Sequence, residues 1–128
     1  MSTTDRTAIE TLLHRYGAAL NASDADAAVA AYTADGLFMP TGAPSARGTQ
    51  ELLASYRFIF SQIRLDVAFT IEEIVVDGDL AMAVTSSAGT QTILAAGTTG
   101  PEANRELFAL RREPEGWRIA RYMFNKAG

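Results

Sequence analysis

Residues 15–24 of this chain read Arg15-Tyr16-Gly17-Ala18-Ala19-Leu20-Asn21-Ala22-Ser23-Asp24. Tyr16 and Leu20 extend an apolar stripe that starts at Ile9 and repeats every three or four residues, which predicts a helix over residues 4–22. Serine and aspartate commonly cap helices, so Ser23 or Asp24 can begin a second helix almost at once. The stretch therefore predicts two consecutive helices, the first with its Tyr16 ring turned toward the core.

The second helix is expected to lead into a short strand. It should carry Val29 and Tyr32 inward and end at Asp35-Gly36. The apolar residues 37–39 then predict a strand that stops at Pro40, because proline has no N–H to donate to a sheet.

A third helix is expected after a loop over residues 41–48. Thr49 can cap this helix. An apolar face that includes Tyr56 and Phe60 predicts that the helix is buried on one side and runs to about residue 63.

Beyond residue 65 the apolar residues alternate with polar or small ones, which is typical of strands with one buried face. We expect strands over residues 65–76, 80–94, 104–112 and 117–125. Asp77-Gly78-Asp79 marks a hairpin turn, and Gly89 suggests a bulge or bend inside its strand. Residues 95–102 contain two glycines and a proline and predict a loop.

Helices followed by a run of strands indicate an α+β fold. We expect a cone-shaped, curved, mostly antiparallel sheet wrapped around three N-terminal helices. A strongly bent sheet does not fill its own concave face, so this arrangement predicts a cavity. The length of 128 residues is that of one ordinary domain, and we interpret residues 1–128 as a single domain.

Composition excludes several classes of function. The chain has 11 Lys and Arg against 15 Asp and Glu, a net charge of −4, which disfavours nucleic acid or an anionic membrane as a partner. The absence of cysteine excludes thiol chemistry and cysteine-based metal sites and fits a cytoplasmic location. The one histidine, His14, lies off the apolar stripe and is expected to face solvent. We therefore expect no metal and no cofactor.

The order of elements, together with RYGAALNASD (residues 15–24), FMPTG (residues 38–42) and GWRIARYMFN (residues 116–125), resembles the nuclear transport factor 2-like superfamily. Within it the chain is most similar to the SnoaL-like polyketide-cyclase and ketosteroid-isomerase branch, and the resemblance covers nearly the whole chain. It implies an α+β barrel of the cystatin-like type and a homodimer. The Thr-, Ser- and Ala-rich strand over residues 80–94 is a candidate dimer face, and a merely solvated face is the alternative.

Tyr16 is the first candidate catalytic residue. The resemblance to ketosteroid isomerases implies that a tyrosine in this context donates a hydrogen bond to a substrate carbonyl. A buried phenol needs a hydrogen-bond partner, and a ligand oxygen can be that partner. The alternative is a core tyrosine bonded to protein or water.

Glu106 is the second candidate. It shares one face of its expected strand with Phe108 and Leu110, so this face is predicted to be concave. A carboxyl group there would be desolvated and its pKa raised. In the resembling isomerases an aspartate at this place helps to hold an enolate oxygen. The alternative is a carboxylate paired with Arg105, Arg121 or another arginine near the rim.

The chain departs from the isomerase pattern at Met39. The resemblance places the general base of the isomerases, an aspartate, immediately before the proline of the first strand, where this chain has Met39. A thioether does not accept a proton at neutral pH, so that route is closed. We expect Met39 to be a flexible part of the cavity wall.

Arg121 and Asn125 are expected to share the face of Trp117 on the last strand. If that face is concave, Arg121 can anchor a ligand carboxylate or phenolate, and Asn125 can orient a carbonyl. The expected ligand-binding residues are Met39, Tyr32, Tyr56, Phe60, Phe108, Leu110, Arg121 and Asn125.

Three functions follow from this sequence. The first is a cofactor-free isomerase or cyclase acting on an apolar ketone, enone or polyketide- or steroid-like molecule. The second is a non-catalytic protein that binds such a small hydrophobic molecule. The third is a dimeric association domain.

Overall fold

The computed structural model describes residues 3–127. Three helices come first along the chain: α1 (Thr3–Asn21), α2 (Ala25–Ala30) and α3 (Gly48–Gln62). α1 buries the expected stripe, with Tyr16 inside it. The carboxylate of Asp24 accepts a hydrogen bond from the N–H of Ala27 at 3.0 Å and so caps α2. The first helix and this cap are therefore as the sequence predicted.

The start of α3 differs from the expectation by two residues. The helix begins at Gly48, so Arg47 rather than Thr49 is the capping residue, and the Arg47 side chain makes no capping bond. Instead the carboxylate of Glu51, in the first turn, accepts a hydrogen bond from the N–H of Arg47 at 2.8 Å. A side chain reaching back from the helix thus replaces the expected threonine cap.

One curved sheet forms the rest of the molecule. Its strands are β1 (Tyr32–Met39), β2 (Ala46–Arg47), β3 (Ile63–Asp77), β4 (Leu80–Ile93), β5 (Thr98–Glu113) and β6 (Gly116–Lys126). Their order across the sheet is β2-β1-β6-β5-β4-β3. Within residues 3–127, β1 and β6 are the one parallel pair, and all other neighbours are antiparallel. The α+β fold and the mostly antiparallel sheet are confirmed.

The second helix is shorter than expected and the first strand is longer. α2 ends at Ala30 and Tyr32 already belongs to β1, so Asp35-Gly36 lies inside a strand instead of ending a helix. The pairing of β1 with β6 is irregular between Tyr32 and Leu37. Asp35-Gly36 thus lies where the pairing of β1 is interrupted. An Asp-Gly pair is typical both of such an interruption and of a helix end, so the sequence pattern does not distinguish them.

β5 is also longer than expected. It begins at Thr98, so Pro101 lies in a strand, opposite Thr90 of β4, and not in a loop. β6 reaches along β5 only as far as Asn104. Beyond that point one edge of β5 is unpaired, and proline is tolerated on such an edge because no hydrogen bond is required from it.

Gly89 permits a close approach of two strands without a bulge. It pairs with Val67 in unbroken register, and the irregularity in β3 lies instead between Ile71 and Glu73. A Cβ atom on Gly89 would lie 2.0 Å from the carbonyl oxygen of Asp66. Only a residue without a side chain fits here, next to the bent middle of the sheet.

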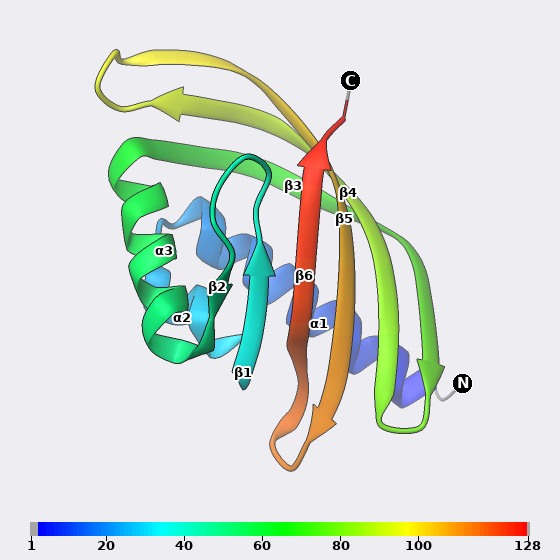
Figure 1. Cartoon of the computed structure of the whole chain (residues 1–128). Helices are drawn as coiled ribbons and strands as arrows, with labels where there is room; N and C mark the ends of the chain where they lie inside the picture. Colours follow the sequence, from blue (N-terminus) through cyan, green and yellow to red (C-terminus); the bar gives the residue numbers. More distant parts are fainter. Residues whose placement is uncertain (1–2, 128) are drawn as a thin grey trace.

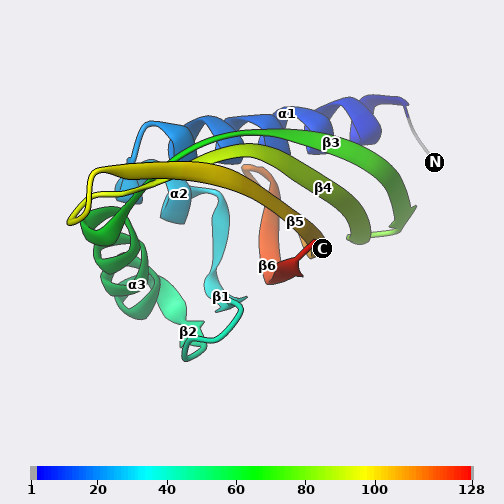
Figure 2. The same ribbon diagram turned by 90° about the horizontal axis from the view of Figure 1, so that it is seen from above.

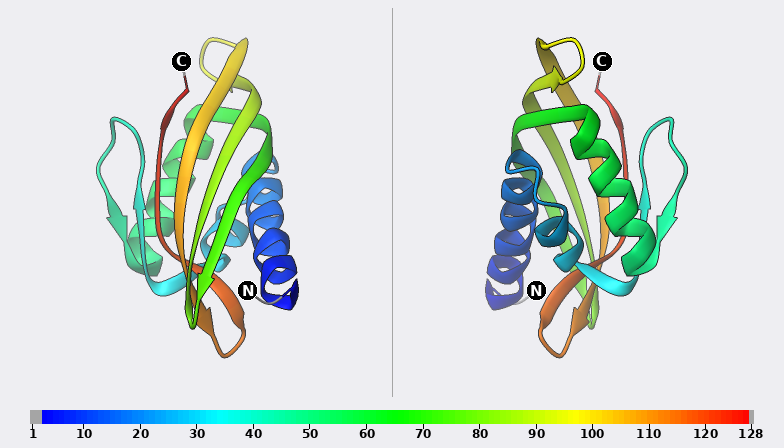
Figure 3. Two further views of the ribbon diagram at one scale, coloured as in Figure 1. Left: turned by 90° about the vertical axis from the view of Figure 1, so that its right-hand side faces the viewer. Right: turned by 90° about the vertical axis from the view of Figure 1, so that its left-hand side faces the viewer.

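The three helices lie on one face of the curved sheet. The right-hand view of Figure 3 shows α1, α2 and α3 in front of the strands. Figure 1 and Figure 2 show the hairpin of β4 and β5 reaching over α3, and the N–H of Leu94 donates to the carbonyl of Gln62 at 3.0 Å there. The apolar core fills the space between helices and sheet.

The helices of the described chain do not span membranes. Among residues 3–127, none is both long and apolar enough to cross a bilayer.

Candidate functional site

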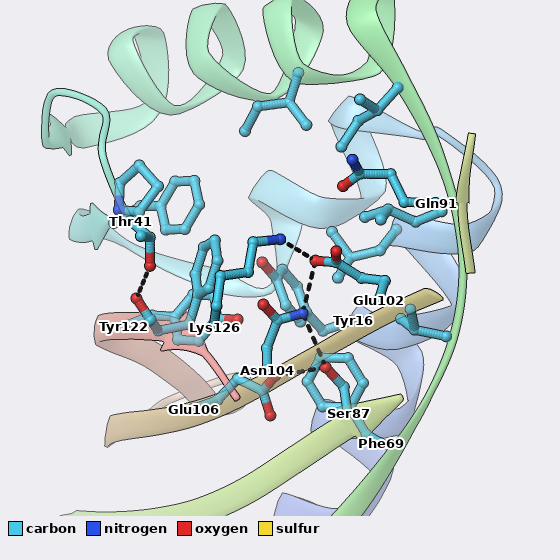
Figure 4. A pocket seen from close by; sticks show the side chains of 18 of the residues that line it. Tyr16, Thr41, Phe69, Ser87, Gln91, Glu102, Asn104, Glu106, Tyr122 and Lys126 are labelled. Carbon is cyan, nitrogen blue, oxygen red and sulfur yellow. Dashed lines mark hydrogen bonds and ion pairs between the residues drawn. The ribbon is translucent and has the colours of Figure 1, made fainter. Parts of the chain in front are cut away.

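A cavity of about 200 Å³ lies between the concave face of the sheet and the helices. Most of its wall is aromatic or aliphatic, and a smaller polar part comes from β4, β5 and β6 (Figure 4). The lining residues are Tyr16, Leu20, Phe38, Pro40, Thr41, Ala43, Tyr56, Ile59, Ile63, Leu65, Val67, Phe69, Ser87, Gln91, Glu102, Asn104, Glu106, Tyr122, Phe124 and Lys126. An apolar pocket with a few convergent polar groups is the usual form of a small-molecule site.

Three tyrosine hydroxyl groups form a chain beside the cavity. The hydroxyl of Tyr56 lies 2.5 Å from that of Tyr16 and 2.6 Å from that of Tyr32. Burial raises the pKa of each phenol above its ordinary value, so all three stay protonated at neutral pH. Three hydroxyl protons serve two hydrogen bonds, which leaves one proton to donate. Tyr16 and Tyr56 line the cavity and can direct this proton into it.

Glu106 is buried on the concave face, as the sequence predicted, and is only 4% exposed. Its two carboxylate oxygens accept hydrogen bonds from the hydroxyls of Thr85 and Ser87, each at 2.6 Å. Burial raises the pKa of Glu106, and these two hydrogen bonds partly oppose that rise. The alternative of an arginine partner is wrong, because within residues 3–127 no arginine forms an ion pair with Glu106, and Arg105 and Arg121 bond elsewhere.

A row of polar side chains continues from Glu106 along the cavity (Figure 4). The Asn104 amide nitrogen donates to Ser87 Oγ at 3.4 Å and to Glu102 Oε2 at 3.0 Å. Lys126 forms an ion pair with the same carboxylate oxygen of Glu102. The other oxygen of Glu102, Oε1, makes no hydrogen bond within residues 3–127. A carboxylate at the cavity wall thus has one oxygen without a hydrogen-bond donor.

Arg121 and Asn125 do not line the cavity, contrary to the expectation. Ala109 pairs with Arg121 while the next residue, Leu110, pairs with Ile119. Ala120 is therefore the extra residue of a bulge, which exchanges the two faces of β6 beyond it. Arg121 instead donates to the carbonyl of Asp35 at 3.2 Å.

Beyond the bulge, each residue of β6 that faces the cavity comes one position later in the sequence than alternation from Trp117 predicts. They are Tyr122, Phe124 and Lys126. Asn125 is exposed and accepts a hydrogen bond from Arg105 at 2.9 Å. A strict alternation counted from Trp117 misses these three inward residues because the bulge adds one position to the count.

Met39 is not part of the cavity wall, so this expectation is wrong. Phe38 is the inward residue of β1, and its ring stacks between the rings of Tyr56 and Tyr122 at 4.9 and 5.5 Å. Met39 points to the other face of the strand, where it pairs with Met123. Phe38 and Pro40 therefore form the wall where the resemblance to isomerases places a general base, and neither can accept a proton.

The remaining expected residues divide into two groups. Tyr56 lines the cavity, as does Tyr16. Tyr32, Phe108 and Leu110 are buried behind the wall, and Phe60 is partly buried against the core; none of these four lines the cavity. They support the site without lining it. His14 is exposed, as expected.

Sequence reasoning missed the polar side chains Ser87, Glu102, Asn104 and Lys126. The sequence does contain a signal for two of them. Glu102 and Asn104 lie four and two residues before Glu106, so alternation along β5 places them on the same concave face as Glu106. The signal was hidden because residues 95–102 contain Gly97, Gly100 and Pro101 and read as a loop.

Comparisons with known proteins show the family and the fold of the chain. The model of the SnoaL-like domain matches residues 1–123. The structure of a ketosteroid isomerase-like protein from Erwinia carotovora atroseptica is 36% identical, with a TM-score of 0.94 and 99% of each chain covered. A comparison with curated proteins finds no match.

Two further solved structures extend the similarity. An NTF2-like protein with a cystatin-like fold from Novosphingobium aromaticivorans is 26% identical, with a TM-score of 0.75 and 96% and 82% of the two chains covered. An NTF2-like superfamily protein from Salmonella enterica is 18% identical, with a TM-score of 0.88 and 100% and 94% coverage. The latter likeness concerns the fold alone.

Proposed function

Because the chain belongs to the family of SnoaL-like domains, we propose that its cavity binds a small, flat, largely apolar molecule through an oxygen atom of that molecule. One observation carries this proposal: two hydrogen bonds join the hydroxyls of Tyr32, Tyr56 and Tyr16, and the Tyr16 end of this chain lines the cavity, where the third hydroxyl proton can be donated to a ligand. A carbonyl or phenol oxygen is the matching acceptor. The aromatic wall formed by Phe38, Tyr122 and their neighbours suits a planar ring.

The size of the cavity limits the ligand. Pockets for drug-sized molecules measure roughly 300–1,000 Å³, whereas this cavity measures about 200 Å³. A molecule with one or two rings suits that volume better than a four-ring steroid. Within the oxygen-bearing, polyketide- or steroid-like compounds expected from the sequence, the cavity favours the smaller aromatic ketones and phenols.

A second candidate function is cofactor-free proton transfer on such a ketone. It is favoured by the free Oε1 of Glu102, a carboxylate oxygen in the cavity that can serve as general base. Glu102 would take a proton from the carbon next to the carbonyl. The electrons of that C–H bond would form a C=C bond, and the carbonyl oxygen would become an enolate stabilised by the tyrosine proton. Such a donor contributes about 3–4 kcal/mol to the transition state.

Calorimetric titration with acetophenone tests binding. Wild type is expected to bind it, and Tyr16→Phe is expected to bind about 2- to 10-fold more weakly, because one net hydrogen bond is lost. His14→Ala is the control, since His14 is exposed and outside the cavity. Equal affinity in wild type and Tyr16→Phe would contradict binding through the tyrosine chain.

The same compound separates a binder from an enzyme. In D₂O, catalysed enolisation exchanges the methyl hydrogens of acetophenone for deuterium, which NMR detects. The proton-transfer function predicts exchange by wild type and its loss in Glu102→Gln. Binding of acetophenone without any hydrogen exchange would contradict the proton-transfer function and support a non-catalytic binding protein.

We also propose that two copies associate through the outer face of β4, β5 and β6. Met82, Leu107 and Met123 are 40%, 43% and 47% exposed on this face. Leu107 and Met123 are cross-strand neighbours, so they form a continuous apolar patch, which is typical of interfaces. Light scattering after gel filtration is expected to give a dimer for wild type and a monomer for Leu107→Lys. A monomeric wild type would overturn this proposal.

A further inference from the structure

The side-chain oxygen of Asn104 is buried without a hydrogen-bond partner. Asn104 is 8% exposed, and its Oδ1 is the one buried side-chain polar atom within residues 3–127 that lacks a partner. Almost all buried polar atoms in proteins are paired, so an unpaired acceptor at a cavity wall calls for a specific explanation. Figure 4 shows the Asn104 side chain projecting into the cavity.

The orientation of this amide is fixed by its neighbours. Its nitrogen donates to Glu102 Oε2 at 3.0 Å and to Ser87 Oγ at 3.4 Å. Rotation of the amide by half a turn would place Oδ1 against the Glu102 carboxylate, and two acceptors would then face each other. Lys126 holds that same carboxylate in place. Glu102 and Lys126 therefore keep Oδ1 turned away from them, as an acceptor with no protein donor.

We propose that Asn104 Oδ1 is a recognition point for a ligand hydroxyl or N–H group. This inference rests on the proposed function and narrows it. The ligand then carries two polar groups on a flat apolar body: an acceptor oxygen for the tyrosine chain and a hydrogen-bond donor for Asn104. Hydroxylated aromatic ketones and their amino counterparts are the chemical class that fits.

The charges beside Asn104 favour a neutral donor over a cation. Glu102 is already paired with the ammonium group of Lys126. A second cation at Asn104 would lie beside this ammonium group, and the neighbouring carboxylate without a cationic partner, Glu106, already accepts hydrogen bonds from two hydroxyls. A phenolic hydroxyl or an uncharged N–H makes the same hydrogen bond without that repulsion.

Matched acetophenones test the inference. The ortho, meta and para hydroxyacetophenones keep the carbonyl and supply a donor at three spacings, and the methoxy isomers fill similar space without a donor. For wild type we expect at least one hydroxy isomer to bind about 2- to 10-fold more tightly than its methoxy counterpart, as measured by calorimetry.

The variant Asn104→Leu, of similar volume, is expected to abolish this hydroxy preference, which is the ratio of two affinities measured on the same variant and is therefore independent of any general change in acetophenone binding. Asn125→Leu is the matched control, because it replaces an exposed amide that lies outside the cavity wall and should keep the preference. Asn104→Ala serves if Asn104→Leu does not fold, with folding checked by circular dichroism.

The possible failures are distinguishable. If wild type binds none of these compounds, the proposed function fails and the inference fails with it. If wild type binds acetophenone but prefers no hydroxy isomer, or if Asn104→Leu keeps the preference, only the inference on Asn104 is overturned.

Discussion

The hydroxyl oxygens of Tyr16 and Tyr56 lie 2.5 Å apart, although α1 and α3 carry them at positions 40 residues apart in the chain. The two rings meet edge to face, with their centroids 6.3 Å apart. Both phenols have pKa values raised by burial. The contact is therefore between two neutral hydroxyls, and it stays so well above neutral pH. The hydroxyl of Tyr16 or Tyr56 therefore keeps its proton when it faces the cavity.

Tyr32, the member of the hydroxyl chain that does not line the cavity, is expected to affect stability more than ligand binding. Tyr32→Phe removes the 2.6 Å hydrogen bond to Tyr56 and should lower the free energy of unfolding by about 0.5–1.5 kcal/mol, measured by urea denaturation. Acetophenone affinity should fall less than in Tyr16→Phe, because Tyr32 does not line the cavity. Tyr122→Phe is the control, since the Tyr122 hydroxyl bonds to nothing within residues 3–127. A larger stability loss in the control would contradict this role for the chain.

Glu106 is expected to make stability depend on pH. Burial raises its pKa in the folded protein above the ordinary value of 4.5. Between 4.5 and the raised value the folded state binds more protons than the unfolded state, so stability must fall as pH rises through this window. The unfolding free energy of wild type relative to Glu106→Gln should therefore decrease above pH 4.5 and level off beyond the folded pKa. A difference that stays constant or grows with pH would refute a raised pKa.

A methyl group at position 89 is expected to be poorly tolerated. In Gly89→Ala the new Cβ would lie 2.0 Å from the Asp66 carbonyl and 2.8 Å from Val67 Cα, both backbone atoms that cannot move aside alone. We expect a loss of about 2–3 kcal/mol or more, visible as a lower melting temperature. Gly100→Ala is the matched control on β5, because a Cβ there meets nothing within 4 Å. Similar melting temperatures for the two variants would show that the backbones of β3 and β4 do not approach each other closely at Gly89.

The bulge at Ala120 predicts which residues of β6 affect the ligand. Phe124→Ala removes part of the cavity wall and should weaken acetophenone binding about tenfold. Arg121→Ala removes a side chain on the other face and should leave the affinity unchanged. Loss of binding in Arg121→Ala alone would contradict the bulge and would mean that β6 alternates regularly from Trp117, with Arg121 facing the cavity.

The local patterns of the sequence predicted the elements well. The three-and-four spacing that ends at Leu20 gave α1, and Asp24 was expected as a cap and is one. Asp77-Gly78-Asp79 joins β3 to β4 as expected, with Gly78 at a positive φ of 64°. Glu106 and Phe108 lie together on the concave face as alternation predicts. These features depend on residues within a few positions of one another, which is the range that a sequence pattern describes.

The faces of β1 and β6 could not be predicted in the same way. Alternation assigns the inward residue only if the strand is regular, and both strands contain an irregularity. Arg121 therefore faces away from the cavity and Tyr122 faces into it. Met39 was expected in the wall from the resemblance to isomerases, whereas Phe38 is the residue that faces the cavity. Where a bulge lies depends on pairing with a distant strand and on the curvature of the whole sheet.

The sequence by itself thus determined the α+β fold, the inward position of Tyr16 and the buried carboxyl of Glu106, because helix and strand periods are local properties of the chain. Only the tertiary structure decided that Tyr16 meets Tyr56, that Lys126 meets Glu102 and that Asn104 Oδ1 has no partner. Each of these facts joins side chains from different elements. Hydrogen bonding and desolvation act over a few ångströms of space, whatever the separation in sequence.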